Sequence, residues 1–317
     1  MDNNIALTAQ DVADMLKIAK NTVYELIKRD ELNSYKVGRK VRFTLSDVED
    51  YIARSKCIQE FLPLAEIAQP DEALIQVSPK FTGKDFIICG QDLMLDVLSS
   101  HIEKHPLGVR ALRSYIGSYN SLVALYHGTV QIATAHLWDG DTGEYNIPFV
   151  RRLLPGIPTV IIHLTCRVQG FYVAKGNPKN IKTWCDLIKP GVTMINREKG
   201  SGSRILLDEH FRLLGIDGNT INGYNRESQS HFAVASTVGR GGADVALGQE
   251  KVSKQVKSVD FIPLQTERYD LVIRKEDFDS PAVRAILDIL NSEEFKLEFE
   301  GIEGYDTREM GKVITEI

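Results

Sequence analysis

The stretch NREKGSGSR, residues 196–204, decides how the larger part of this chain is organised. An apolar run at residues 192–195 precedes it and predicts a short buried strand. Leu207, Phe211 and Leu214 follow at the spacing of one helix face. A strand, a Gly/Ser turn and a helix N-terminus leave several backbone N–H groups pointing one way, and the helix dipole attracts anions to them. The stretch therefore predicts an anion-binding turn.

One Gly/Ser turn is equally compatible with a simple helix cap flanked by solvated arginines. The Lys-Ser/Thr ending of a nucleotide-binding P-loop is missing, which excludes that kind of phosphate site. Similar turns occur elsewhere, because Gln91 and Asp92 follow one apolar run, and Gly117 and Ser118 follow another. The recurrence favours the anion site over the cap.

Composition indicates a folded chain without a secretion or membrane signature. Its 317 residues are 43% hydrophobic and 26% charged, which predicts a soluble protein of two or three domains. The four cysteines show no CxxC spacing, the first residues do not resemble a signal peptide, and no apolar run approaches the roughly 18 residues of a spanning helix. We therefore expect reduced thiols, a cytoplasmic location and no membrane partner.

The net charge of −5 hides a basic N-terminal region. Between Lys17 and Arg42, eight basic side chains accompany three acidic ones, whereas acidic residues outnumber basic ones after residue 58. A basic region on an acidic body is typical of a domain that meets a polyanion. A solvated helix face would give a similar count of charges. The order of apolar and polar residues in this region is needed to distinguish the two interpretations.

Residues 8–52 have the pattern of two short helices, a β-hairpin and a third helix. A capping box of Thr8 and Asp11 starts the first helix. The second helix combines an apolar face with a polar face of Lys20, Asn21, Tyr24 and Lys28. YKVGRKVRF at residues 35–43 alternates around a Gly-Arg turn and predicts the hairpin. Ser46 and Glu49 are expected to cap the third helix.

Residues 5–54 resemble the excisionase/MerR-like winged helix-turn-helix domains that open many bacterial regulators. The match includes residues 22–24 at the start of the second helix and residues 37–39 in the hairpin, although Ala19 replaces the usual N-cap serine and residues 30–31 replace a glycine. The resemblance implies that the second helix enters the major groove of double-stranded DNA while the hairpin contacts the backbone. The residues expected at the DNA are Lys20, Asn21, Thr22, Tyr24, Lys28, Arg39, Lys40 and Arg42. A helical domain used for protein contacts is the alternative.

From residue 84 onward, predicted strands alternate with predicted helices, which is typical of an α/β fold. Residues 159–164 and 170–174 are expected to be two strands that pass through a hinge. In open α/β sheets, ligands bind at the carboxyl ends of strands, where the small polar turns of this sequence occur.

This body resembles the periplasmic-binding-protein-like domains of the type II solute receptors. Residues 117–150, 195–208 and 230–248 carry the resemblance, and it is closest to an intracellular branch found behind helix-turn-helix domains and on molybdopterin-biosynthesis enzymes. The resemblance implies two lobes, of residues 85–165 plus the C-terminal part and of residues 168–260, with a ligand cleft at the hinge. We expect a winged helix-turn-helix head (residues 1–56), a packing segment (57–84) and a receptor body (85–317).

The tetrahedral-oxyanion receptors of that superfamily hold molybdate, tungstate or sulfate with backbone N–H groups and hydroxyls, and Ser118, Ser201 and Ser203 suit that chemistry. Additional charged side chains leave room for a larger anion, such as a phosphorylated or pterin-like metabolite. The ligand-binding residues expected here are Gln91, Asp92, Ser118, Tyr119, His136, Thr142, Arg197, Ser201, Gly202, Ser203, Arg204 and His231.

Enzyme motifs are missing from this sequence. The histidines show no HExxH or HxH spacing, and no GxSxG elbow surrounds a serine, so we expect neither a metal site nor catalytic residues. The expected function is a one-component transcriptional regulator, acting as a homodimer or higher oligomer, that binds DNA and senses a small anion, with molybdate or tungstate first and another anionic metabolite second. An anion-processing enzyme is the remaining alternative, and no cofactor other than a bound oxyanion is expected.

Overall fold

The computed structural model describes residues 7–28, 32–38, 40–48, 51, 86–302 and 304–317, and its contacts divide the chain into two units, Met1–Val77 and Ser78–Ile317. The expected packing segment at residues 57–84 lies outside the described residues, and so do Arg39 and Glu49.

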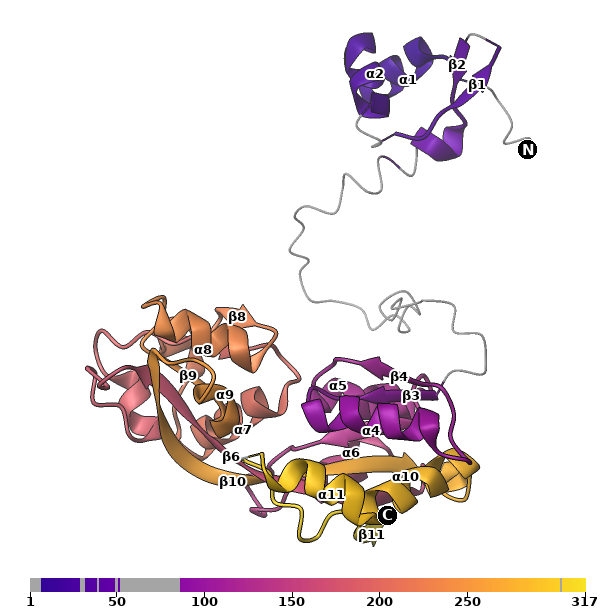
Figure 1. Ribbon diagram of the computed structural model, residues 1–317. Coiled ribbons are helices and arrows are strands. Elements are labelled where there is room, and N and C mark those ends of the chain that lie inside the picture. The colour runs from indigo at the N-terminus through magenta and orange to yellow at the C-terminus, as the bar shows by residue number, and fades with distance from the viewer. Residues whose placement is uncertain (1–6, 29–31, 39, 49–50, 52–85, 303) are drawn as a thin grey trace. The chain divides into compact units, whose positions relative to one another are not determined.

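The N-terminal unit contains the expected helices and hairpin (Figure 1). Its elements are α1 (Ala9–Leu16), α2 (Lys20–Lys28), β1 (Tyr35–Val37) and β2 (Lys40–Arg42), with β1 and β2 paired antiparallel. Thr8 and Asp11 form the predicted capping box at α1, and Gly38 turns the hairpin with φ 62°. Val12, Val23 and Phe43 are fully buried and hold the elements together.

The cap of the third helix differs from the expectation. Residues 45–48 are helical, so Ser46 lies inside the helix instead of before it. Thr44 and Asp47 make the reciprocal bonds instead: Asp47 N–H donates to Thr44 Oγ1, and Thr44 N–H donates to Asp47 Oδ2 at 2.8 Å. The backbone of Phe43 pairs with Leu7, so Thr44 is the first residue released from pairing and takes the cap position.

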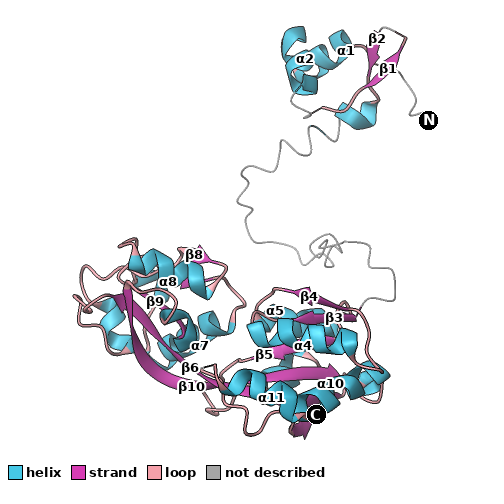
Figure 2. Cartoon of the chain, in the orientation of Figure 1, coloured by secondary structure: helices cyan, strands magenta, loops and turns pink. Residues whose placement is uncertain are grey.

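The second unit is built on one seven-stranded sheet (Figure 2). Its strands are β3 (Phe86–Cys89), β4 (Ala111–Ser114), β5 (Ile132–Ala135), β6 (Thr159–Ala174), β9 (Val245–Gln249), β10 (Val259–Arg274) and β11 (Val313–Glu316). The order is β11-β6-β10-β5-β3-β4, with β9 also paired to β6. β6 and β10 are 16 residues long each and run from one lobe into the other as an antiparallel pair.

β6 is one continuous strand where two were expected. Thr165, Arg167 and Gln169 lie between the two apolar runs and have the pattern of a break between strands. In the structure they remain paired, because Arg167 lies opposite Glu267 of β10 in the strand register. Charge pairing across the ladder thus lets the strand pass through the hinge without interruption.

The first lobe packs helices on both faces of the sheet. Its helices are α4 (Leu93–Lys104), α5 (Ser118–Tyr126), α6 (Ile147–Leu153), α10 (Pro281–Asn291) and α11 (Glu293–Glu300). Leu98, Ile162 and Phe295 belong to the core under α4, α10 and α11, whereas Leu122 and Val272 belong to the core under α5 and α6. Chain segments nearly 200 residues apart therefore complete this lobe together.

The second lobe is formed by the middle of the unit. Its elements are β7 (Asn196–Arg197), α7 (Gly202–Leu214), β8 (Glu227–Ser228), α8 (His231–Gly239) and α9 (Glu250–Ser253), besides β9 and the far halves of β6 and β10. Single 3₁₀ turns lie at Trp184–Ile188, Gly218–Thr220 and Lys275–Asp277, the last of them in the first lobe. The strand expected at residues 192–195 is reduced to a bridge between Met194 and Val245, and the regular pairing follows at β7.

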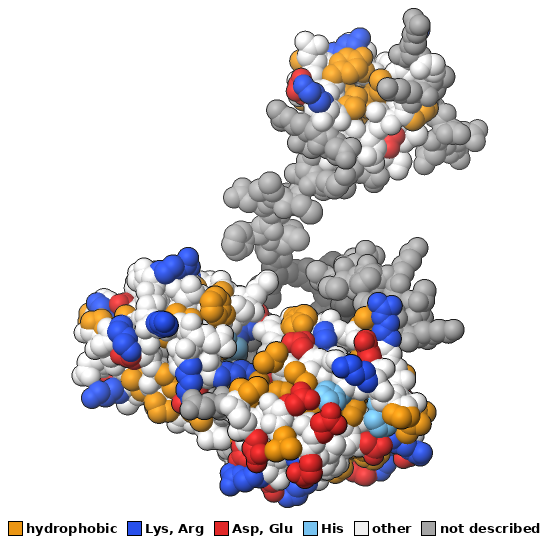
Figure 3. Space-filling view, viewed as in Figure 1, with side chains coloured by type: hydrophobic (Ala, Val, Ile, Leu, Met, Phe, Trp, Pro, Cys, Tyr) orange, Lys and Arg blue, Asp and Glu red, His pale blue; other side chains and the backbone are white. Residues whose placement is uncertain are grey.

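Charged side chains are distributed unevenly over this unit. On the face drawn in Figure 3, Asp and Glu gather over the lobe that carries α10 and α11, while Lys and Arg are more frequent over the lobe that carries α8. Within the described part of the chain, no helix has the length and apolar character needed to cross a membrane. The α/β fold with a helix-turn-helix head and a two-lobed body is confirmed.

Phe295→Ala tests the core that joins α11 to α4. Phe295 is fully buried, so its truncation should lower the free energy of unfolding of the body by about 3–5 kcal/mol. Leu297 lies on the same helix and is 61% exposed, so Leu297→Ala should change stability by less than about 0.5 kcal/mol. Urea unfolding followed by circular dichroism measures both. Equal losses in the two variants would contradict the assigned core.

Candidate functional site

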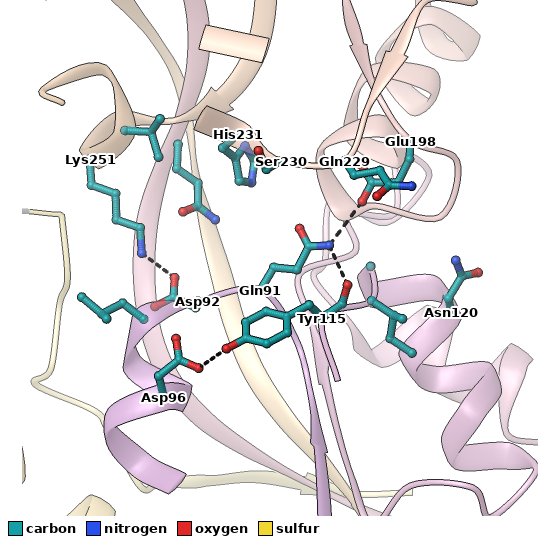
Figure 4. Close-up of a pocket in the computed structure, with 15 residues that line it drawn as sticks. Gln91, Asp92, Asp96, Tyr115, Asn120, Glu198, Gln229, Ser230, His231 and Lys251 are labelled. Carbon is teal, nitrogen blue, oxygen red and sulfur yellow. Dashed lines mark hydrogen bonds and ion pairs between the residues drawn. The ribbon is translucent and has the colours of Figure 1, made fainter. Parts of the chain in front are cut away.

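The two lobes enclose a cleft with a volume of about 700 Å³. The first lobe contributes Gln91, Asp92, Leu93, Asp96, Tyr115, Ile116, Gly117 and Asn120, and the second contributes Glu198, Gln229, Ser230, His231, Gln249, Lys251 and Val252. Figure 4 shows Lys251 and His231 facing Asp92 and Gln91 across this space. A smaller inner cavity of about 20 Å³ shares Gln91, Gly117 and His231 with the cleft. The site is thus a roomy outer cleft that narrows to a small inner end.

Three helix N-termini supply the walls of the inner cavity. Ser118 begins α5, Gly202 and Ser203 begin α7, and His231 begins α8. Ser201 caps α7 by accepting a hydrogen bond from Arg204 N–H at 3.3 Å. The first N–H groups of a helix have no partner inside the helix, so these ends present donors and a positive dipole to the cavity.

Glycine permits the close approach of these helix ends. Tyr119 N–H donates to the carbonyl of Gly200 at 3.0 Å, which joins the start of α5 to the Gly/Ser turn of the other lobe. A Cβ at Gly117 would lie 2.5 Å from that same oxygen, and one at Gly202 would lie 2.4 Å from the ring of His136. A side chain at either position would therefore force the two lobes apart.

A buried charge network underlies the inner cavity. Arg167 is 3% exposed and contacts Asp92 at 2.6 Å, Glu267 at 2.5 Å and the ring of Tyr269 at 3.8 Å. Lys251 of the second lobe also reaches Asp92, at 2.5 Å, as the dashed line in Figure 4 marks. Burial opposes the charged form of Asp92, yet Lys251 and Arg167 hold the pKa of its carboxyl well below the usual range. Asp92 is therefore a fixed anion that organises the lobes.

Arg197 brings a second guanidinium to the inner cavity. It donates to Gln91 Oε1 of the opposite lobe at 2.7 Å and to both carboxylate oxygens of Glu198 at 2.8 Å. Gln91 Nε2 in turn donates to the carbonyl of Tyr115 at 3.1 Å. Arg197 is 2% exposed, so its charge acts inside the protein. These bonds form a second bridge between the lobes.

Two residues of the inner cavity keep a buried nitrogen without a polar partner in the described part of the chain. Across the described residues, Arg167 Nε and His231 Nδ1 make no hydrogen bond, whereas His136 Nδ1, which makes none either, lies 2.6 Å from Glu267 Oε2 in an ion pair. Burial, and then the charge of Arg197, lowers the pKa of His231 well below its ordinary value, so this imidazole is neutral. Buried polar atoms usually have partners, and leaving them unpaired is costly. The inner cavity therefore has hydrogen-bonding capacity that a ligand can use.

The structure brings together most of the ligand-binding residues expected from the sequence. Those that line one or both cavities are Gln91, Asp92, Ser118, His136, Arg197, Ser201, Gly202, Ser203 and His231. His136 additionally contacts Glu267, with its Nδ1 2.6 Å from Oε2. Asp92 contributes to the wall, but its oxygens are occupied by the charge network.

Three of the expected residues line neither cavity. Arg204 pairs with Asp208 and Glu227 and stacks on Tyr224, because a helical arginine directed away from the cleft meets the acids of its own lobe. Thr142 donates to Asp139 at 2.7 Å and stabilises a turn. Tyr119 is 36% exposed, and only its backbone takes part, through the bond to Gly200.

Several lining residues were not expected from the sequence, among them Arg167, Gln249 and Lys251. Arg167 and Glu267 are charged residues within mainly apolar strands, 100 positions apart, and only the strand register brings them together. A charged residue in an otherwise buried strand was the one available signal. Among the described residues, no three His, Cys, Asp or Glu side chains gather in a way that would hold a metal ion.

The head presents the polar helix face expected from its sequence. Lys20, Asn21, Thr22, Tyr24 and Lys28 are exposed on α2, and Val23 and Leu26 of the same helix are buried. Lys40 is exposed in β2, while Arg42 is half-buried and donates to the carbonyl of Val41. Arg39 lies outside the described residues. The head therefore exposes Lys20 and Lys28 on α2 and Lys40 on β2.

Comparisons with known families agree with this architecture. Residues 99–291, more than half of the chain, match the PBP superfamily domain. The chain belongs to the PBP superfamily. Residues 6–56 match a helix-turn-helix domain, which corresponds to the head. A helix-turn-helix head on a PBP body is the arrangement of a ligand-sensing, DNA-binding protein.

Two relatives share this sequence over different lengths. The uncharacterized protein YvgK of Bacillus subtilis is 40% identical over 316 residues, covering 100% of both chains. An uncharacterized protein encoded in the 5′ region of a 2Fe-2S ferredoxin gene of Clostridium pasteurianum is 62% identical over 113 residues, which is 36% of this chain and 100% of that one.

Solved structures resemble the PBP body in fold. A candidate phosphate ABC transporter substrate-binding protein from Clostridium perfringens, with bound phosphate, has a TM-score of 0.53 at 14% identity and covers 70% of this chain and 99% of its own. The P235GK mutant of the arginine-binding protein ArgBP from T. maritima has a TM-score of 0.50 at 14% identity, covering 69% and 95%. At this identity the likeness concerns the two-lobed fold alone.

The charge network should make the PBP body sensitive to acid. Burial opposes ionisation of Glu267, but Arg167 and then His136 lower its pKa to about 2, against about 4.3 in an unfolded chain. The stability from this carboxylate is therefore full above about pH 4.3 and is lost as the pH falls through about 2.

Glu267→Gln should remove most of that dependence, so urea midpoints between about pH 5 and pH 3 should decline less steeply than in the wild type. Glu103 is exposed on α4, and Glu103→Gln should keep the wild-type slope. If the urea midpoint of Glu267→Gln falls with pH as steeply as that of the wild type, the ion pair between Glu267 and Arg167 contributes nothing to stability.

Proposed function

We propose that this protein is a one-component transcriptional regulator that acts in the cytoplasm. Its head binds double-stranded DNA, and its PBP body closes on a small anionic ligand. The observation that carries the ligand proposal is the inner cavity, where three helix N-termini meet two buried nitrogens without partners. Neutral hydroxyl and backbone donors around a buried guanidinium favour an anionic group over a cation.

The size of the cleft favours an anion larger than a bare oxyanion. A cavity of about 700 Å³ is in the range that holds a small organic molecule, whereas the inner cavity of about 20 Å³ has room for about one water-sized group. A phosphorylated or pterin-like metabolite would insert one anionic oxygen into the inner end and fill the outer cleft with its remaining atoms. Molybdate or tungstate remains the alternative, and it requires the inner cavity to widen around a tetrahedral ion.

A panel of probes separates these two ligands. Melting of the full chain would be compared with molybdate, tungstate, sulfate and phosphate on one side and with phosphorylated and pterin-like metabolites on the other. A ligand at about 100 times its dissociation constant adds about 2.7 kcal/mol to the free energy of unfolding. Stabilisation by an organic anion alone supports the larger ligand, while stabilisation by molybdate or tungstate alone supports the oxyanion. An enzyme would convert its ligand during the assay, and a regulator would release it unchanged.

Ser201→Asp tests the helix end at the cavity. Aspartate caps a helix as well as serine does, so the stability of α7 should be kept while a negative charge enters the anion site. Affinity for the stabilising anion should fall by well over about tenfold, because like charges repel in a site with little water. Titration calorimetry measures the change.

Ser280→Asp is the matched control for this variant. Ser280 caps α10 in the same way, by accepting from Val283 N–H, and it lines neither cavity. It should therefore leave ligand affinity unchanged. If Ser201→Asp also binds like the wild type, the Gly/Ser turn is only a cap.

Lys28→Ala tests the DNA face of the head. Phosphate contacts release counterions, so removing one contact should weaken binding to all sequences and reduce the salt slope of the binding constant by about 1. Lys104→Ala, on α4 of the body, removes the same charge elsewhere and should leave the slope unchanged. Fluorescence anisotropy at several salt concentrations gives the slopes. A head that binds protein instead of DNA would show the same weak slope in all three chains.

A further inference from the structure

A second polar cluster lies in the body, outside both cavities, where β6 passes from one lobe to the other. It consists of Cys166 and His163 of β6 and Asp270 of β10. None of the three lines the ligand cleft or its inner end. The proposed ligand site therefore leaves this cluster without a role.

A β-bulge brings the cysteine and the histidine to the same side of the strand. Residues three positions apart on a regular strand point to opposite faces. Asp270 is paired with His163 and the preceding Tyr269 with Thr165, so Leu164 is an extra residue in the ladder. The extra residue shifts the alternation by one, and Cys166 and His163 then share a face.

The three side chains form a chain of polar contacts with His163 at its centre. His163 Nε2 lies 3.8 Å from Cys166 Sγ, and His163 Nδ1 lies 2.8 Å from Asp270 Oδ1. His163 is 3% exposed and Asp270 is fully buried, so neither can turn away into solvent. Asn146 Nδ2 and Arg268 Nε donate to the other oxygen of Asp270, at 2.7 and 2.8 Å. A thiol, an imidazole and a carboxylate in this order are the arrangement that activates a nucleophile.

The group in contact with the sulfur is the imidazole of His163. Burial opposes protonation of His163, but its bond to Asp270 and its contact with Cys166 raise its pKa to about 9, so the imidazole is a cation at neutral pH. Arg268 lies opposite Cys166 in the strand register, and its guanidinium is paired with Asp270. The backbone of Asp306 pairs with Cys166 from the other side, and the Asp306 carboxylate is paired with Arg308. Cations beside a thiol favour its thiolate form, which is the nucleophile.

The other described cysteines lack this combination. Cys89 is buried, and burial raises the pKa of its thiol to about 11 against the opposing effects of Ser114 and Arg113. Cys185 is exposed in the 3₁₀ turn Trp184–Ile188, and no histidine lies within hydrogen-bond distance of it among the described residues. Cys166 is partly exposed and has the imidazole beside it. Cys166 is therefore the described cysteine that combines solvent access with an adjacent imidazole.

We propose that Cys166 is a reactive thiol that hydrogen peroxide oxidises to a sulfenic acid. The thiolate sulfur attacks one oxygen of the peroxide, so an S–O bond forms as the O–O bond breaks. Sulfur loses two electrons and the peroxide gains them. The departing hydroxide takes the proton of His163 Nε2 and leaves as water. His163 is the proton donor of this step, and Asp270 is the positioning residue that holds its ring toward the sulfur.

The test compares the cysteines within one molecule. Full-length protein at neutral pH would be treated with hydrogen peroxide and dimedone, which traps sulfenic acids, and the adduct on each cysteine would be quantified by peptide mass. Cys166 should be trapped on the order of tenfold faster than Cys185, although Cys185 is more exposed. In guanidinium chloride the two rates should become equal. Equal rates in the folded protein, or a faster Cys185, would overturn the proposal.

His163→Gln supplies the second measurement. Glutamine retains hydrogen bonding without the charge, so the Cys166 rate should fall to about that of Cys185, while the Cys185 rate stays unchanged. Asp270→Asn should lower the Cys166 rate in the same direction. Melting curves report whether each variant is folded. If neither variant folds, the ratio of the Cys166 and Cys185 rates in the wild type decides the proposal. An unchanged Cys166 rate in folded His163→Gln would show that the imidazole does not activate the thiol.

Discussion

The contact on which the body depends is the one between Arg167 and two buried carboxylates. Asp92 starts a helix of the first lobe, Glu267 belongs to the long strand pair, and Lys251 of the second lobe joins them at Asp92. Taking charges out of water is costly, and each carboxylate is tolerated because the guanidinium is present. Removing Arg167 would leave the two buried carboxylates with fewer partners, Lys251 at Asp92 and His136 at Glu267. Arg167 therefore contributes to the relative placement of the lobes, together with the second bridge that Arg197 makes to Gln91.

Local chemistry made much of the fold predictable. The capping box at Thr8 and the Gly-Arg turn of the hairpin are short-range signals, and both elements occur as expected. The alternation of apolar runs and small polar turns indicated the α/β body. The middle of β6 was misinterpreted because its polar residues are balanced by side chains 100 positions away. The local pattern shows a charged residue in a mainly apolar strand, but it does not identify the partner of that residue.

The sequence identified the cavity-lining residues that lie at helix ends, but it did not identify those that lie within strands. Ser118, Ser201 and Ser203 belong to turns whose sequence predicts a helix N-terminus, and the structure brings those turns together. Arg204 has the same local context but points toward Asp208, a neighbour one helical turn away. Sequence shows that a residue is near a helix end, but the direction of its side chain depends on tertiary packing.

The discontinuous first lobe has a consequence for biosynthesis. Its core joins α4 near the start of the body to α10 and α11 near the end of the chain, and β11 comes later still. At about 5–20 residues per second, the ribosome takes roughly 10–40 seconds to make the intervening segment. During that time α4 keeps its apolar face without its final neighbours, whereas the head has already been synthesised. The nascent chain is therefore able to acquire its DNA-binding head before its sensory body, and chaperones have a defined interval in which to protect the exposed face of α4.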